Sequence, residues 1–153
     1  MGTHIGPLYV RRSGFIRATP ERVWEEFTSF ERLDAWFSYG HKMESCDPRQ
    51  GGAIRLSGET DGVKSYFGGT ILVFDPGREL TFTEDWETDP GPFPQLITIR
   101  LTPLYDGCHV ELFHHGFERL GDAAAEELEG HEIGWHAHHI ERLRAVVEKS
   151  STG

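Results

Sequence analysis

Glutamate and histidine side chains that could transfer protons or bind a ligand gather in the second half of the chain. Six of the nine histidines fall between His114 and His139. Glu132 and His136 are four residues apart, and His136 and His139 are three apart, so on a helix all three share one face. Carboxyl and imidazole groups that face one another can bind a ligand, exchange protons or hold a metal ion. Whether they meet depends on the elements that carry them.

A single long helix is predicted from about residue 123 to residue 149, a segment without proline whose early part is rich in alanine and glutamate. Apolar side chains recur along it at helical spacing and, with His136, should form one buried stripe: Ile133, Ile140, Leu143 and Val147. A helix of about 20 residues is ~30 Å long and can cover a small sheet. Its first turns should therefore overhang the last strand of that sheet.

The rest of the chain predicts mainly antiparallel strands. A strand at residues 9–16 precedes two short helices, the first opened by Thr19-Pro20-Glu21 and the second near residues 30–37. Between residues 41 and 117, alternating sequences separated by turn signals predict about six further strands. This order predicts an α+β fold in which the long helix covers the buried face of one sheet.

The hairpin positions predict which polar residues face inward. A turn centred near residue 105 places Ile97 opposite His114. A loop centred near residue 90 places Glu84 opposite Ile97, on the same face. Neighbouring strands are ~4.8 Å apart, so Glu84 and His114 should lie ~10 Å apart, with room for a ligand or water between them.

The predicted ligand-contacting residues come from three strands and the long helix. They are Phe82, Glu84, Trp86, Ile97, His114, Trp135, His136 and His139. An unpaired charge inside would be costly, so Glu84 should contact the ligand, be hydrogen-bonded or lie at the cavity mouth. Structural alternatives remain: Trp135 could be a packing residue and His114 a hydrogen-bonded core histidine. No catalytic residue is assigned.

A metal site formed by His114 with the glutamate and histidines of the helix is the alternative, since these side chains supply oxygen and nitrogen ligands. Their spacing matches no established zinc signature, and we expect neither a bound metal nor another cofactor. Cys46 and Cys108 are far apart and match no metal or redox spacing.

Composition excludes several classes of protein. A net charge of -10 argues against a nucleic-acid-binding surface. No apolar run approaches the ~20 residues of a membrane span, and the N-terminal residues do not read as a signal peptide. We expect a single cytoplasmic domain over residues 1–153 with a loose tail at 149–153. The oligomeric state stays open.

Short segments across the chain occur in a characteristic order. They are Ala18-Thr19-Pro20-Glu21-Arg22-Val23-Trp24, Asp47-Pro48-Arg49-Gln50-Gly51-Gly52, Gly69-Thr70-Ile71-Leu72-Val73-Phe74-Asp75-Pro76, Leu80-Thr81-Phe82-Thr83, His114-His115-Gly116-Phe117, and Gly134-Trp135 with Leu143. Together they resemble the START-related (SRPBCC) superfamily, and within it the branch named for the activator of the heat-shock-protein-90 ATPase. The resemblance implies a helix-grip fold, in which a curved antiparallel sheet of six or seven strands wraps around a C-terminal helix with a cavity between them.

The resemblance does not imply one chemistry, because members bind lipids, hormones or polyketides and some are aromatases or cyclases. We expect a binding module for a small apolar or aromatic molecule. The first alternative is an enzyme of aromatase, cyclase or hydrolase-like type on the same cavity. The second is an interaction protein of co-chaperone type, although the eukaryotic co-chaperone carries a further N-terminal domain that 153 residues cannot accommodate.

Overall fold

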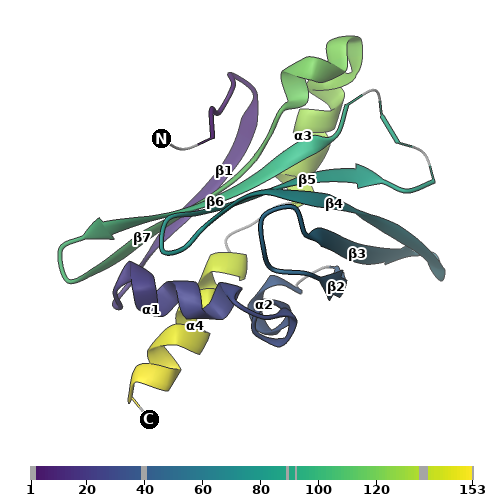
Figure 1. Cartoon of the computed structure of the whole chain (residues 1–153). Helices are drawn as coiled ribbons and strands as arrows, with labels where there is room; N and C mark the ends of the chain where they lie inside the picture. Colours follow the sequence, from purple (N-terminus) through teal and green to yellow (C-terminus); the bar gives the residue numbers. More distant parts are fainter. Residues whose placement is uncertain (1–2, 39–40, 89, 92, 135–137, 153) are drawn as a thin grey trace.

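One antiparallel sheet forms the centre of the protein (Figure 1). The computed structural model describes residues 3–38, 41–88, 90–91, 93–134 and 138–152. The seven strands lie in the order β1-β7-β6-β5-β4-β3-β2. Their bounds are β1 Tyr9–Ile16, β2 Lys42–Cys46, β3 Ala53–Thr60, β4 Val63–Asp75, β5 Glu79–Trp86, β6 Gln95–Leu104 and β7 Gly107–His115. The α+β prediction with one antiparallel sheet is confirmed.

Two short helical segments follow β1 as predicted. Helix α1 (Pro20–Trp24) begins after Thr19, whose side chain accepts a hydrogen bond from the Arg22 amide at 3.1 Å. The 3₁₀ turn η1 (Glu25–Phe27) connects it to α2 (Phe30–Phe37), which Ser29 caps in the same way. Proline at the first helical position and hydroxyl caps before both helices explain why the chain leaves β1 in this form.

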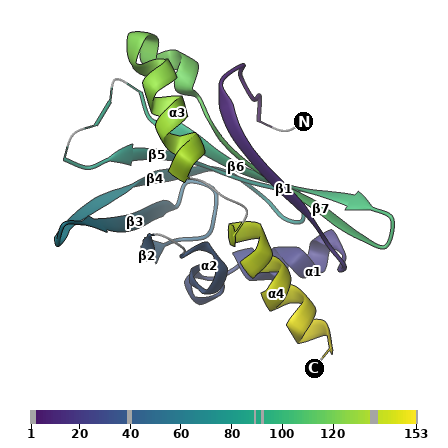
Figure 2. The same cartoon turned by 180° about the vertical axis from the view of Figure 1, so that it is seen from behind.

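The C-terminal helical segment consists of two helices in the structure, where a single helix was predicted over residues 123–149. The 3₁₀ segment η2 (Phe117–Ala123) leads into α3 (Ala124–Gly134), and α4 (His138–Thr152) follows. Residues 135–137 lie outside the described chain. Gly134 ends α3, which fits the preference of glycine for helix ends. The two views place α3 at the end of the sheet away from α1, and α4 beside α1 and α2 (Figures 1 and 2).

Helix α4 carries the predicted apolar stripe. Ile140, Leu143 and Val147 are at most 2% exposed and belong to the main hydrophobic core. Helix α4 packs against α2 and β1. The part of the stripe assigned to Ile133 and His136 concerns side chains that the structure does not describe. No helix of the described residues is long and apolar enough to cross a membrane.

The inner face of the sheet is apolar at alternate positions, as the sequence predicts. Inward side chains of β5, β6 and β7 are buried: Leu80, Phe82, Ile97, Ile99, Leu101, Val110 and Leu112. Aromatic side chains of the first helical segments close this core: Trp24, Phe27, Trp36 and Phe37. These four aromatic side chains therefore belong to the core.

The predicted strand register is correct for the β6–β7 hairpin and incorrect for the β5–β6 hairpin. Ile97 pairs with His114 across β6 and β7, as predicted from the two-residue turn between Leu104 and Gly107. Glu84, however, pairs with Gln95 and not with Ile97. A two-residue turn determines register, whereas the ten-residue connection between Glu84 and Gln95 leaves it free. The predicted β5–β6 register was therefore wrong by two residues, while the side of the sheet was right.

The outer face is partly covered by the N-terminal segment before β1. The amide and hydroxyl of Thr3 both donate to the Glu79 carboxylate. From Glu79 a hydrogen-bond chain continues through the hydroxyls of Thr81 and Thr98 to His115 Nε2, with steps of 2.8, 2.9 and 2.8 Å. Glu79, Thr81, Thr98 and His115 are at most 4% exposed, and these hydrogen bonds supply the partners that buried polar groups need.

Candidate functional site

Six of the eight predicted site residues lie in the described chain, and their environments differ. Phe82 and Ile97 face each other across β5 and β6 and are fully buried. The Glu84 side chain is 12% exposed, and Trp86 at the end of β5 is half exposed. Trp135 and His136 lie outside the described residues. The predicted cavity bounded in part by these two residues therefore stays a prediction.

Glu84 and His114 lie much closer than predicted. Glu84 Oε1 is 4.0 Å from His114 Nε2, whereas strand spacing predicted ~10 Å. The predicted distance is that between the strand backbones, whereas the 4.0 Å distance joins side-chain atoms that extend toward each other over β6. His114 Nε2 also lies 3.0 Å from Gln95 Oε1, the residue opposite Glu84. These three side chains form one polar group on the apolar inner face.

Burial changes the charge state of the Glu84 carboxyl group. It raises the pKa of Glu84 to about 8, and the neighbouring Asp85 carboxylate adds to the effect. At pH 7 Glu84 is therefore mainly a neutral carboxylic acid, which carries an O–H donor. Within the described part of the chain Glu84 makes no hydrogen bond, and its nearest partner is His114 at 4.0 Å.

Aromatic side chains flank Glu84 on β5, and a series of ring contacts joins them across the inner face. Along β5, Phe82 and Trp86 flank Glu84 on the same face, since side chains alternate along a strand. Each ring contacts the next in a series that runs Phe82, Phe37, His139, His41, Phe67 and Trp86. The centroid distances between successive rings are 6.1, 5.4, 5.4, 5.9 and 5.0 Å. We call these six residues the inner-face ring. They come from α2, β4, β5, α4 and the segment before β2.

The two histidines of the inner-face ring stack on each other, with an interplanar angle of 21°. Burial lowers the pKa of His41 to about 4, against the opposing effect of a backbone hydrogen bond at Phe37. His41 is therefore neutral at pH 7. His139, which was predicted as a site residue, is 4% exposed. The two imidazole rings therefore continue the aromatic surface of the inner-face ring.

The predicted site residues do not include four members of this region: Phe37, His41, Phe67 and Gln95. Phe37 belongs to the aromatic cluster of the core, and His41 was predicted only as the start of the strand region. Gln95 was placed opposite Trp86 because of the register error. A histidine four residues after the helix end at Phe37 was the available signal for His41, but it does not indicate a partner 98 residues further along the chain.

The metal alternative gains no support from the described residues. Among them, no group of three or more His, Cys, Asp or Glu side chains is arranged to hold a metal ion. The side chain of Glu132, like that of His136, is not described, so the full predicted ligand set is not present for comparison.

Comparisons with known proteins agree with this architecture. Protein CV1439 from Chromobacterium violaceum is 29% identical, with a TM-score of 0.72 over 94% of this chain and 99% of that chain. ChR145 from Cytophaga hutchinsonii is 26% identical, with a TM-score of 0.67 over 99% and 100% of the two chains. Protein NE0264 from Nitrosomonas europaea is 19% identical and shares the fold, with a TM-score of 0.72 over 95% and 97%.

A search of curated proteins finds no match. The family model described as activator of Hsp90 ATPase homolog 1-like protein matches residues 17–148. This range includes the six strands β2 to β7, together with the inner-face ring and most of α4, and begins directly after β1. The resemblance inferred from the short segments is confirmed: the chain belongs to the family of activator of Hsp90 ATPase homolog 1-like proteins.

Proposed function

We propose that the chain binds a small, uncharged, apolar or aromatic molecule against the inner-face ring, with Glu84 donating a hydrogen bond to it. The observation that carries the proposal is the state of Glu84. Its side chain is 12% exposed and its ion-pair partner His114 lies 4.0 Å away, so a neutral carboxyl group lies between Phe82 and Trp86 without a hydrogen bond to the described residues. A ligand acceptor at this carboxyl group would form a hydrogen bond in an apolar surrounding, and such a bond contributes ~0.5–1.5 kcal/mol.

The surroundings support the uncharged class of ligand. Glu84 and His41 are both mainly neutral at pH 7, so no formal charge among them attracts an ion. Aromatic faces provide stacking surface, and ring pairs add ~0.5–1.5 kcal/mol beyond the buried area. The matching ligand therefore has a flat apolar body and one acceptor oxygen, such as a carbonyl.

Two measurements test this proposal. Native mass spectrometry of protein purified without added ligand should show a retained small molecule. Titration with 2-acetylnaphthalene, followed by tryptophan fluorescence, should then give saturable binding. Glu84→Gln keeps a donor and should bind this probe as well as the wild type, whereas Glu84→Leu should bind it about tenfold more weakly.

Naphthalene, which has no acceptor, is the matched control ligand. It should bind the wild type and both variants with similar affinity, because only the apolar contacts remain. Equal binding of 2-acetylnaphthalene to all three proteins would remove the role of Glu84. No binding of either compound, together with a stable protein partner, would favour the interaction role instead.

A proton-transfer enzyme is the second candidate, and the Glu84–His114 pair favours it. A carboxyl group whose pKa lies near neutral pH can donate and regain a proton, and His114 Nε2 lies 4.0 Å away. In such a reaction Glu84 would protonate the acceptor oxygen that it otherwise only binds. The discriminating result is a turnover that falls as the pH rises through 8 and is lost in Glu84→Gln while binding is retained.

A further inference from the structure

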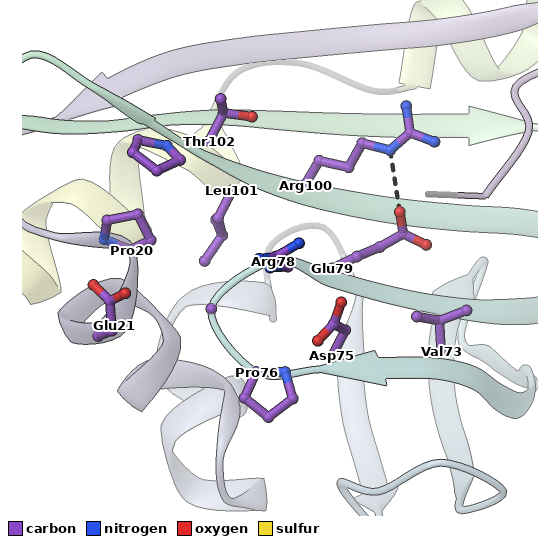
Figure 3. A pocket seen from close by; sticks show the side chains of 12 residues that line it. Pro20, Glu21, Val73, Asp75, Pro76, Arg78, Glu79, Arg100, Leu101 and Thr102 are labelled. Carbon is purple, nitrogen blue, oxygen red and sulfur yellow. Dashed lines mark hydrogen bonds and ion pairs between the residues drawn. The ribbon is translucent and has the colours of Figure 1, made fainter. Parts of the chain in front are cut away.

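A pocket lies at the other end of β5, away from the inner-face ring. Its volume is about 670 Å³, within the usual range of ~300–1,000 Å³ for small-molecule sites. The N-terminal residues of α1 form one wall, the turn between β4 and β5 forms the other, and the end of β6 lies between them (Figure 3). Pro20, Pro76 and Leu101 give the pocket an apolar surface.

The backbone of β6 offers hydrogen-bond acceptors to this pocket. The Leu101 amide donates to the Arg78 carbonyl at 2.8 Å, so Leu101 directs its backbone groups toward the β5 side. Two residues later, Pro103 directs its carbonyl to the same side. The Arg78 amide donates to the Asp75 carbonyl at 2.9 Å and not to Leu101. Because β5 begins at Glu79, opposite Arg100, no strand of the described chain covers the last residues of β6 on that side.

This open edge is poorly suited to another β-strand. Pro103 has no N–H group, so an added strand would lose one of its ladder hydrogen bonds at this residue. The carbonyl groups of Leu101 and Pro103 instead favour a ligand group that donates several hydrogen bonds and accepts few.

Carboxylates complete the set of acceptors. Glu21 projects from the α1 wall and Asp75 from the wall formed by the turn (Figure 3). Both are exposed, and neither forms an ion pair with any residue in the described ranges. Glu79 and Arg100 also line the pocket, but they pair with each other at 3.1 Å. Arg78 is the opposing charge, exposed at the same turn.

We propose that this pocket binds the guanidinium or primary ammonium group of an aliphatic compound. The cationic head would donate to the Glu21 and Asp75 carboxylates and to the two backbone carbonyls. The aliphatic stem would pack on the prolines. The net charge of -10 adds long-range attraction for such cations. The cation can come from a free amine or from an arginine side chain of a peptide, since both present the same chemistry.

Titration followed by backbone amide NMR shifts tests the proposal with two probes, agmatine and the peptide acetyl-Gly-Arg-Gly-amide. Both should shift the amides of Gly77, Arg78 and Thr102, and N-butylurea, a neutral analogue of the head and stem, should not. Tighter binding of the peptide would identify a protein side chain as the source, and tighter binding of agmatine a free amine.

Variants separate this site from general attraction to an acidic protein. The double variant Glu21→Gln/Asp75→Asn should weaken agmatine binding about tenfold. The charge-matched control Glu59→Gln/Asp61→Asn, in the exposed β3–β4 hairpin, should stay within about twofold of the wild type. Arg78→Gln should bind more tightly, since it removes the opposing charge. Equal losses in both double variants, or N-butylurea binding as well as agmatine, would overturn the proposal.

Discussion

Replacing Glu84 with glutamine is expected to stabilise the protein at pH 7 and above. Glutamine has nearly the shape of the protonated side chain, but it cannot ionise. In the unfolded chain Glu84 ionises near its ordinary pKa of 4.5, whereas in the folded protein its pKa is about 8. Folding at pH 7 must therefore keep a proton on Glu84 that the unfolded chain has released.

The magnitude follows from the difference between these two states. At pH 7, about 2.5 pH units above the ordinary pKa, the cost to the folded state is about 3 kcal/mol at ~1.36 kcal/mol per unit. The cost grows from pH 4.5 up to about pH 8 and is constant above that. Because the folded pKa of this acid is raised, the wild type loses stability as the pH rises, and the variant does not share that loss.

Thermal unfolding between pH 4 and 9 measures the difference directly. A gain of about 3 kcal/mol corresponds to a melting temperature about 6–12 °C higher for a domain of this size. At pH 4 the two proteins should melt together. Glu59→Gln, in an exposed hairpin position, is the matched control and should follow the wild type at every pH. A difference between Glu84→Gln and the wild type that does not change with pH would refute a buried, neutral Glu84.

The remaining predictions concern the core and the outer face. Leu143→Ala should lower the free energy of unfolding by ~2–5 kcal/mol in urea titrations, because Leu143 is 0% exposed in the α4 core; an unchanged midpoint would contradict the packing of α4. Thr81→Val should cost ~1–3 kcal/mol in the same assay, because it leaves buried partners at Glu79 and Thr98 unsatisfied. Burial alone would raise the pKa of Glu79, but the hydrogen bonds from Thr3, Thr81 and Arg100 lower it. These hydrogen bonds therefore stabilise the folded state above pH 4.5. The wild type should lose this stability as the pH falls below that value. Glu79→Gln should be less stable at pH 7 and lose less on acidification, and parallel pH profiles would contradict this.

Local patterns in the sequence were sufficient for the main architecture. Alternation along β5, β6 and β7 showed which side chains face inward, because a strand has only two faces. The two-residue turn after Leu104 determined the β6–β7 register, since so short a connection allows one pairing. The spacing of Ile140, Leu143 and Val147 identified the buried face of α4. The capping residue Thr19 marked where the first short helix begins.

Tertiary structure decided the contents of the site. The ten-residue connection after Glu84 permits several registers, so its pairing with Gln95 depends on the packing of the whole sheet. The contact between His41 and His139 joins segments 98 residues apart, and nothing in either segment specifies the other. The pKa of Glu84 depends on what surrounds the carboxyl group, not on its place in the chain. The sequence alone determined which residue types face the interior. Only the folded chain decided which of them meet and which stay charged, because burial and long-range packing are properties of the assembled structure.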